Sequence, residues 1–423
     1  MPQTADMTGT TEAAASSERV RRLVIVGGGI GGMAAALAFR QRGFQVDILE
    51  RRSALSEDGA GIQIGPNGMR ILTSLNVDQR LAPYVGKPER IAVFEGDTGQ
   101  RLAELPLGSW IENRHGAPYW VAHRSDLQLA LYQTIQDVDG IAVHLNQDVT
   151  DVDDLRGEAV TVHTAEGGVY RGEAVIVADG LWSPLRQRFF GEASPTFSGK
   201  CALRAVVPVE LVPKAIRADE TGVWLSPHGH IVHYPVQGGL AIALVVVLQD
   251  DAVNQDWSTR VHPSWVQHGV RAFAQDAQDL IGAVTEWRKW ALHELAVPST
   301  FTRGRIALLG DAAHPVLPFL AQGGVLALED AVVAARCAAE STDMETAIRA
   351  YEAERRPRIA SVQTASKRNG EIYHLDGAMA AARNLTLKYA PSSFLMAQYD
   401  WLYGWRLDGR GRSRAWSARL SGG

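Results

Sequence analysis

Apolar and polar residues alternate along this chain in a way that predicts its first three elements. An apolar run over Leu23–Ile30 predicts a buried parallel strand. The following segment, MAAALAFRQRG, is rich in helix-forming residues and ends at Gly43, a residue that commonly follows a helix. A second apolar strand over Gln45–Leu49 ends at Glu50. This order predicts a β-α-β unit on a parallel sheet.

The rest of the pattern divides into mixed, strand-rich and helical parts. A strand-rich part at about 198–248 has four apolar runs separated by Gly, Pro and His turns, which predicts an antiparallel sheet. The other predicted elements are a helix from Asn67, two strands within 89–105 joined near Gly96–Gly99, a helix with Ser125 as its N-cap, strands at 141–145, 159–164 and 174–178, a helix around 263–280, helices from 330 to about 339 and from Met344 to Lys367, and further helices to about Trp405.

A glycine pattern lies between the first predicted strand and helix. Gly27, Gly29 and Gly32 form G-x-G-x-x-G, which permits a tight turn and a close approach of the backbone to a pyrophosphate. The N-terminus of the next helix would present free N–H groups and a partial positive charge to that group. Glu50, 18 residues beyond Gly32, suits ribose hydroxyls. The alternative is an ordinary glycine turn, and the complete strand-helix-strand-acid set argues against it.

Composition excludes several classes of partner. The net charge of −5 gives no general attraction to nucleic acid or anionic lipid. Cys201 and Cys337 are the two cysteines of the chain, so no disulfide framework is expected and a cytoplasmic location fits. The apolar run Leu240–Leu248 is too short to span a bilayer and is better interpreted as a buried strand.

Two further motifs follow apolar strands. Asp179-Gly180 ends one strand, and its simplest alternative is a turn with Ser183 as a helix cap. Gly310-Asp311 ends another, where an acid can accept hydrogen bonds from sugar or ribityl hydroxyls. The carboxyl ends of strands are where open α/β sheets bind ligands.

Taken in order, the three motifs resemble those of the group A flavoprotein aromatic hydroxylases. The resemblance covers about residues 21–406, and several phrases are similar to those of the 3-hydroxybenzoate 6-monooxygenase, salicylate 1-monooxygenase and 6-hydroxynicotinate 3-monooxygenase groups. These phrases are GAGIQIGPN (59–67), PYWVAHRSDL (118–127), GHIVHYPVQGG (229–239), LAQGGVLALEDA (320–331) and YDWLYGWR (399–406).

The order of the predicted elements argues for two interleaved domains, and the resemblance implies an α/β fold in which a Rossmann-like FAD-binding domain is interleaved with an antiparallel-sheet substrate domain and followed by C-terminal helices. The expected division is a disordered leader (1–20), the first part of the FAD-binding domain (21–190, with about 85–120 contributing to the substrate domain), the substrate domain (191–290), the return of the FAD-binding domain (291–365) and a C-terminal helical region (366–423). A homodimer is common among the relatives.

The resemblance also assigns residues to FAD. The adenosine half would contact Glu50 and Arg51, and Asp179 would be shared between FAD and the pyridine nucleotide. Asp58, Gly59, Ala60 and Gln63 would lie near the flavin, Arg124 would contact FAD, and Asp311 would bind the ribityl chain. The alternatives are a surface charge for Arg51 and a neighbour of a helix cap for Arg124.

Gly323 and Gly324 begin a predicted helix, VLALEDAVVAARCAA. Its N-terminus would face the N1–C2 carbonyl edge of the flavin and stabilise the anionic reduced form through free N–H groups and the helix dipole. The alternative is a loop-to-helix junction that needs a flexible backbone.

The implied chemistry is a hydroxylation that consumes NAD(P)H and dioxygen and proceeds through a flavin C4a-hydroperoxide. The substrate would be a small phenolic aromatic acid similar to 3-hydroxybenzoate or salicylate. Alternatives are a hydroxynicotinate-type N-heteroaromatic substrate or a non-catalytic FAD-binding redox protein. A halogenase would show W-x-W-x-I-P, which TEWRKWAL does not supply, and a lipid epoxidase would want a membrane anchor.

His230 is the candidate base, because a phenol reacts best as phenolate and neutral His is suited to accept its proton. Strand alternation puts His230, Val232 and Tyr234 on one face and His233 on the other. Tyr234 would donate to the phenolate or the carboxylate, as the resemblance also implies. The alternative is a pair of half-buried strand residues. No metal is expected, since His228, His230 and His233 cannot share one face of a regular strand.

Other residues have weaker assignments. His314 is more simply structural or flavin-adjacent than a base, and Trp401 and Trp405 are interpreted as packing or a subunit contact. Arg186 and Arg204 would meet a substrate carboxylate or NAD(P)H, although each is more often a surface ion pair. Two substrate-side positions depart from the family: Pro318 replaces the glutamine of some 3-hydroxybenzoate relatives, and Gln237 replaces the arginine of many.

Overall fold

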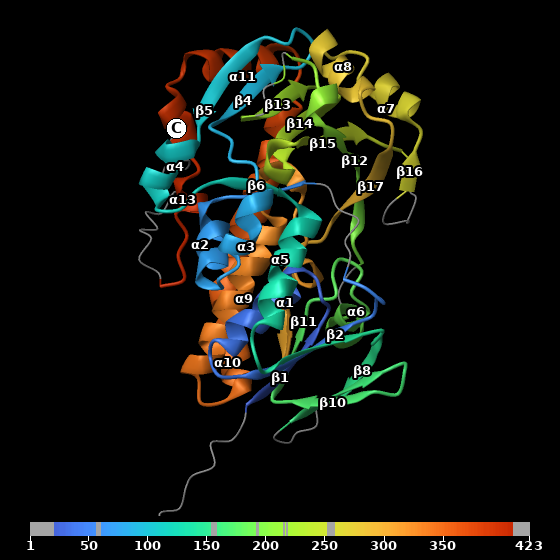
Figure 1. Cartoon of the computed structure of the whole chain (residues 1–423), viewed down its shortest axis with the longest axis vertical. Coiled ribbons are helices and arrows are strands. Elements are labelled where there is room, and N and C mark those ends of the chain that lie inside the picture. The colour runs from blue at the N-terminus through green and yellow to red at the C-terminus, as the bar shows by residue number, and fades with distance from the viewer. Residues whose placement is uncertain are drawn as a thin grey trace, which may run out of the picture.

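The computed structural model describes residues 21–55, 61–153, 159–191, 194–214, 216, 219–251 and 259–408. It shows an α/β fold with one large sheet at each end and long C-terminal helices along the side (Figure 1). The predicted fold class is therefore confirmed. The expected leader, residues 1–20, lies outside the described residues.

The first large sheet has six strands and contains the predicted β-α-β unit. Its order is β18-β19-β11-β1-β2-β7, with β18 antiparallel at one edge. The predicted strand Leu23–Ile30 is too long: β1 ends at Val26, and Ile30 already begins α1, because the intervening glycines form the turn. The bounds are β1 (Arg22–Val26), α1 (Ile30–Arg40), β2 (Gln45–Glu50), β7 (Ile141–Leu145), β11 (Ala174–Val177), β18 (Thr302–Arg303) and β19 (Ile306–Leu308).

Two smaller sheets extend this part of the molecule. A three-stranded antiparallel sheet lies between β7 and β11 in sequence, and a two-stranded sheet pairs the segment after residue 60 with a strand not predicted from the pattern. The first comprises β8 (Val149–Asp153), β9 (Val160–Thr164) and β10 (Val169–Gly172), and the second β3 (Gly61–Ile64) and β6 (Trp120–His123).

The second large sheet has eight strands in the order β16-β17-β12-β15-β14-β13-β4-β5. The pair β4–β5 comes from far earlier in the chain and joins the later strands through a parallel pairing of β4 with β13. The bounds are β4 (Arg90–Glu95), β5 (Arg101–Pro106), β12 (Thr196–Pro208), β13 (Glu220–Ser226), β14 (Gly229–Val236), β15 (Ala241–Gln249), β16 (Thr259–Val261) and β17 (Trp287–Glu294).

The two faces of the eight-stranded sheet have different partners. One face packs on α7 (Pro263–Gly269) and α8 (Gln275–Gly282), with Trp224 and Ile231 in that core. The opposite face carries Tyr234 and packs against residues of α9 (Gly323–Glu340) and α10 (Met344–Tyr373). This second face is where the two halves of the molecule meet.

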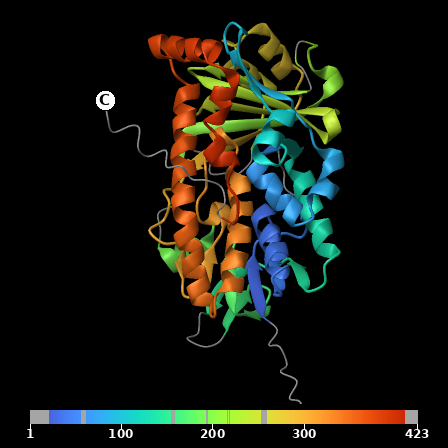
Figure 2. The ribbon, with the colours of Figure 1, turned by 90° about the vertical axis from the view of Figure 1, so that its left-hand side faces the viewer.

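The helix α10 connects both sheets. It is a 30-residue helix that runs along most of the molecule (Figure 2). Near its beginning, Tyr351 donates to the carbonyl of Leu308 in β19 at 3.1 Å. Just past its end, His374 reaches His230 in β14 of the other sheet. The remaining helices are α2 (Pro66–Ser74), α3 (Asp78–Leu81), α4 (Gly108–His115), α5 (Arg124–Gln136), α6 (Pro184–Phe190), α11 (Gly377–Tyr389), α12 (Ser392–Ala397) and α13 (Asp400–Tyr403).

Local predictions failed at two helix ends. His123, not Ser125, is the N-cap of α5, and the Ser125 hydroxyl lies 2.6 Å from Nδ1 of His123 instead. The single helix predicted around 263–280 is two helices, because the chain turns between Gly269 and Gln275. Within the described ranges, no helix combines the length and apolar character that a bilayer crossing needs.

Candidate active site

The glycine turn after β1 is packed directly against the end of β11. Gly27 has φ +107°, and a Cβ there would lie 2.4 Å from the carbonyl oxygen of Ala178. A Cβ on Gly32 would lie 2.0 Å from the carbonyl oxygen of Gly27. No other residue fits at these positions without moving backbone. The turn leads into α1, whose N-cap Gly29 makes no side-chain cap and whose first turn has no acid.

Glu50 closes this turn from the end of β2. Its carboxylate accepts a hydrogen bond from the N–H of Gly28 at 2.7 Å and one from the N–H of Arg52 at 2.9 Å. The acid predicted from spacing therefore lies at the mouth of the glycine turn. Arg51, beside it, is exposed.

Asp179 follows β11 at the same edge of the sheet. Burial raises the pKa of its carboxyl to about 6, against opposing effects of Ser183 and Arg186. Its Oδ1 is buried and has no hydrogen-bond partner among the described residues. A buried acceptor without a partner is costly, so this atom is suited to receive a donor from a ligand.

Arg186 joins the second motif to the third. Its side chain is buried and donates to the carbonyls of Leu181, at 2.7 Å, and Ala312, at 2.9 Å. Arg186 therefore does not form the surface ion pair that was its more usual alternative. Ala312 belongs to the short 3-10 helix that also contains Asp311, which is partly exposed. The three motifs therefore converge at one edge of the six-stranded sheet.

The loop before α9 is fixed by α10. Three side chains on one face of α10 donate to carbonyls of this loop: Gln363 to Pro315 at 2.9 Å, Ser366 to Leu317 at 2.7 Å and Asn369 to Phe319 at 2.6 Å. Pro318 lies between the last two carbonyls and is partly exposed. The loop ends at Ala321, whose φ of +52° is unusual for a residue with a Cβ. Such strain occurs at functional sites when the surroundings hold it.

Gly323 and Gly324 begin α9, as predicted. The N-cap Gln322 makes no side-chain cap to the helix, and the first turn has no acid. A Cβ on Gly324 would lie 2.8 Å from Cδ1 of Ile62, in the segment that the resemblance places near the flavin. The start of α9 is thus open to a ligand and close to β3.

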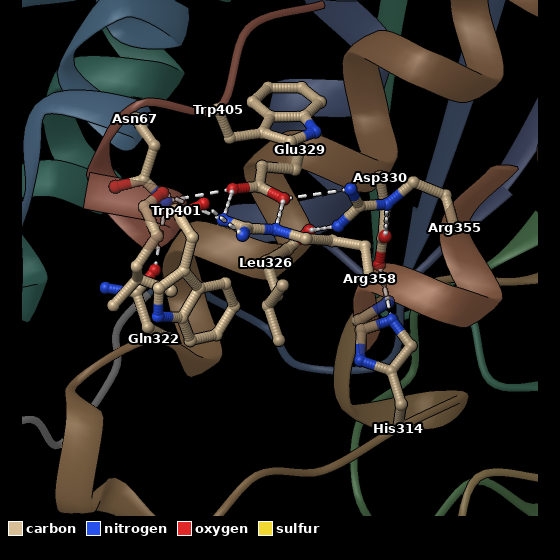
Figure 3. A network of polar contacts seen from close by, with 12 residues as sticks. Asn67, His314, Gln322, Leu326, Glu329, Asp330, Arg355, Arg358, Trp401 and Trp405 are labelled. Carbon is tan, nitrogen blue, oxygen red and sulfur yellow. Dashed lines mark hydrogen bonds and ion pairs between the residues drawn. The ribbon is translucent and has the colours of Figure 1, made fainter. Parts of the chain in front are cut away.

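A buried ionic network joins α9 to α10 (Figure 3). Glu329 and Asp330, both fully buried on α9, face Arg355 on α10, whose guanidinium lies 2.8 and 2.7 Å from their oxygens. Although burial alone would raise the pKa of Asp330, His314 and Arg355 lower it to about 2. His314 lies 2.6 Å from Asp330, which supports its structural interpretation.

The same network reaches the N-terminus of α9 and the C-terminal segment. Asn67 donates to Glu329 at 2.8 Å and to Gln322 at 3.0 Å. Trp401 and Trp405 lie against the guanidinium groups of Arg358 and Arg355, at 5.3 and 5.5 Å from ring centroid to carbon. Both tryptophans therefore take part in packing, as one of their two interpretations expects (Figure 3).

His230 lies in a closed aromatic environment. It is 3% exposed, and the rings of Tyr373 and Phe319 lie 5.1 and 5.6 Å from its ring. Its Nδ1 is 2.9 Å from Nε2 of His374. Burial, together with His374 and Lys200, lowers the pKa of His230 well below its ordinary value, so the ring is neutral near pH 7.

Tyr234 lies on the same face of β14, and His233 on the other. Tyr234 packs so closely on Gly61 that a Cβ there would meet its ring at 2.2 Å. Burial raises the pKa of Tyr234, which keeps its hydroxyl protonated. His233 instead accepts from the indole N–H of Trp224 at 3.3 Å, inside the core beneath α7 and α8. The predicted alternation along this strand is confirmed.

Other predicted residues occupy varied positions. Gln63, in β3, accepts from the hydroxyl of Tyr119 at 2.5 Å, and Arg124 is the first residue of α5. Arg204 lies over the ring of Trp290 at 5.4 Å, so it is more than a surface ion pair. Gln237 follows β14 with φ +53°, within a turn.

Three residues expected near the flavin, Asp58, Gly59 and Ala60, lie outside the described residues.

Sequence reasoning missed His374 and the partners of Glu329 and Asp330. His374 follows the long C-terminal helix and carries no motif, so nothing in the sequence connected it with His230. The two acids did leave a signal, because they interrupt an otherwise apolar helix, VLALEDAVVAARCAA. Buried acids are almost always paired, so arginines on a neighbouring helix could have been expected. Among the described residues, no cluster of potential metal ligands is present.

Comparison with known proteins places this geometry in a family. A family model described as an FAD binding domain matches residues 21–366. A 3-hydroxybenzoate 6-hydroxylase of Polaromonas naphthalenivorans is 32% identical over 91% of this chain and 96% of its own length. A 6-hydroxynicotinate 3-monooxygenase of Pseudomonas fluorescens is 34% identical over 82% and 91%.

Solved structures agree on the fold. A salicylate hydroxylase in complex with its substrate superposes with a TM-score of 0.78, at 22% identity, covering 94% of this chain and 98% of that one. Together with the three converging motifs, these matches show that the chain belongs to the FAD binding domain family, as one of its FAD-dependent aromatic hydroxylases.

Proposed function

We propose that this enzyme uses NAD(P)H and dioxygen to hydroxylate a small phenolic aromatic acid similar to 3-hydroxybenzoate or salicylate. The observation that carries the proposal is a buried, neutral His230 on the same strand face as Tyr234, where the two halves of the molecule meet. His230 accepts the proton of the substrate hydroxyl, which makes the ring electron-rich. Bound FAD supplies the redox chemistry with dioxygen.

The residues of the glycine turn fit FAD. Gly27, Gly29 and Gly32 leave backbone N–H groups of the α1 N-terminus for the pyrophosphate, and Glu50 lies at the mouth of the turn. The unpartnered Oδ1 of Asp179 would accept from a ligand donor. The remaining residues proposed to hold FAD are Arg51, Asp58, Gly59, Ala60, Gln63, Arg124, Asp311, Gly323 and Gly324.

The spacing of His230 and Tyr234 supports an acid whose hydroxyl and carboxylate contact different residues. Four residues along a strand that rises about 3.3 Å per residue separate their Cα atoms by roughly 13 Å. At this spacing the two side chains are able to contact different polar groups of one substrate. In the proposal His230 receives the hydroxyl, Tyr234 donates to the carboxylate, and the ring lies between them over Val232, with Pro318 on the substrate side.

The test is a panel of hydroxybenzoates, salicylates and hydroxynicotinates, with NAD(P)H oxidation followed and products identified by mass. Stoichiometric hydroxylation of a hydroxybenzoate or salicylate supports the proposal. Hydroxylation confined to a hydroxynicotinate favours the second candidate, which the relative from Pseudomonas fluorescens motivates. Flavin retention without any ligand-stimulated oxidation would indicate a non-catalytic redox protein, and peroxide release with every compound would contradict this substrate class.

Gly32→Ala is expected to yield protein that binds little or no FAD. The new methyl group would lie 2.0 Å from the carbonyl oxygen of Gly27, so the turn must open and its N–H groups move. Flavin absorbance per chain after purification and reconstitution measures the effect. Gly282→Ala in α8 is the matched control, because a Cβ there meets nothing within 4 Å. Equal flavin content in both variants would refute the role of the turn.

Asp179→Asn is expected to stabilise the FAD-free protein increasingly as pH rises. Burial raises the folded-state pKa of Asp179 to about 6, so ionising it in the folded state carries a penalty that grows above the unfolded pKa and is complete above pH 6. The advantage of the asparagine variant should therefore grow by about 1 kcal/mol between pH 5 and pH 8. Urea unfolding of both proteins at the two pH values checks this, and parallel pH dependences would contradict it.

A further inference from the structure

A second histidine is paired with the proposed base. His374, the residue after α10, presents its Nε2 to Nδ1 of His230 at 2.9 Å, although 144 residues separate the two in sequence. Between two imidazole nitrogens at this distance, one carries the hydrogen and the other accepts it. The pair therefore shares one proton position, and the Nε2 of His230 takes no part in this contact.

The two rings differ in their access to water. His230 is 3% exposed and enclosed by Phe319 and Tyr373, whereas His374 is only partly buried. His374 is thus hydrogen-bonded to the buried ring and is itself more accessible to water. A proton taken up by His230 has a direct hydrogen-bonded exit through this neighbour.

Burial and the surrounding charges disfavour the protonated form of both rings. Lys200 acts on both rings and Arg383 on His374, and with burial they lower the pKa of His374 to about 4. The other rings that face the pair are those of Tyr373 and Phe319. Neither carries a charge, because burial raises the pKa of Tyr373 and the phenylalanine ring has no ionisable group. Neither ring is therefore expected to hold a positive charge for long.

The end of α10 is held firmly enough to keep the pair aligned. Arg383 on α11 donates to the carbonyls of Ile372 and Tyr373, at 2.9 and 3.0 Å. Gly370 makes room for Phe319, because a Cβ there would lie 2.5 Å from that ring. These contacts fix the residues on either side of the pair.

We propose that His374 relays protons between the buried His230 and solvent during turnover. The inference rests on the proposed hydroxylation. The substrate O–H bond breaks as an N–H bond forms at Nε2 of His230. The N–H at Nδ1 of His230 breaks as its proton bonds to Nε2 of His374, and the Nδ1 proton of His374 leaves to water. The net change is one proton moved from substrate to solvent, and the reverse sequence restores both tautomers.

Chemical rescue tests the relay. His374→Ala is expected to retain FAD and to lower kcat at least 10-fold with little change in KM. Added imidazole should restore much of kcat, whereas pyrazole, of similar size but far weaker as a base, should not. Rescue by both compounds would indicate space filling, and an unchanged kcat in a working enzyme would overturn the relay. His268→Ala, at an exposed histidine near the end of α7, is the control for loss of an imidazole.

A second measurement does not depend on turnover. The relay requires the resting His230 to carry its hydrogen on Nδ1, where it donates to His374. Nitrogen-15 spectra of histidine-labelled enzyme should show this tautomer in the natural chain and a shift toward the Nε2–H tautomer in His374→Ala. A resting Nε2–H tautomer in the natural chain would refute the relay. Absence of hydroxylation across the substrate panel, with the tautomer as expected, would instead refute the proposed function.

Discussion

Replacing His230 with alanine is expected to lower kcat for hydroxylation by about 10²- to 10⁴-fold, the usual contribution of a positioned acid or base. FAD content should stay the same, because the ring of His230 contacts Phe319, Tyr373 and His374 and none of the glycine turn. Rapid-mixing kinetics that separate flavin reduction from hydroxylation would locate the loss. The hydroxylation step should be slow while reduction remains close to that of the natural chain.

His233→Ala is the matched control for this change. It removes the same side chain from the same strand, three residues on, but from the face that packs on Trp224 beneath α7 and α8. Both variants leave a buried cavity, so both should lose stability. If His233→Ala slowed hydroxylation as much as His230→Ala, the loss would reflect packing of β14 and not proton transfer.

Replacing Arg355 with methionine is expected to lower the free energy of unfolding by about 3–5 kcal/mol, the typical cost of leaving a buried charge without its partner. Arg355 is fully buried and pairs with both Glu329 and Asp330, so its loss leaves two acids with less compensation. Denaturant unfolding at pH 7 measures the change. The variant is also expected to bind FAD less tightly, since these acids secure the helix whose N-terminus is proposed to face the flavin.

Two further variants separate charge from volume in this experiment. Arg349→Met, on the same helix, breaks an exposed pair with Glu345 and should cost less than about 1 kcal/mol. Adding Asp330→Asn to Arg355→Met removes the acid that loses its arginine, while Glu329 keeps its pair with Arg358 at 3.0 Å, and should recover part of the lost stability. If the double variant were less stable than Arg355→Met alone, the network would be held by hydrogen bonding and packing more than by charge balance.

Local patterns predicted much of the fold and one half of the site. The glycine turn and the alternation of His230, His233 and Tyr234 depend on neighbours within a few residues, so turn and strand geometry determine them. Glu50 was found from the regular length of the β-α-β unit, which places the end of the second strand beside the turn. The interleaving of the two sheets was likewise readable from the order of strand-rich segments. The pattern placed helix ends less well, as at Ser125, because His123 and Ser125 are both able to cap and the sequence does not decide between them.

Contacts between distant segments were beyond the reach of these patterns. His374 is an unremarkable residue at the end of a polar helix until α10 brings it to β14. Arg355 and Arg358 lie within ERRPR, which by itself suggests a solvated helix face. Only the packing of α10 on α9 turns Arg355 inward to the acids. Such pairs depend on the angle between two helices, which no short segment encodes.

The continuity of α10 makes it a spacer of fixed length. Arg355, anchored beneath α9, and His374, beside β14, are separated by about 28 Å of helix at 1.5 Å per residue. Removing or adding one residue between them would turn everything beyond it by about 100° and carry Gln363, Ser366 and Asn369 away from the loop they hold. Substitutions on the outer face of this helix should be tolerated, but changes in its length should not.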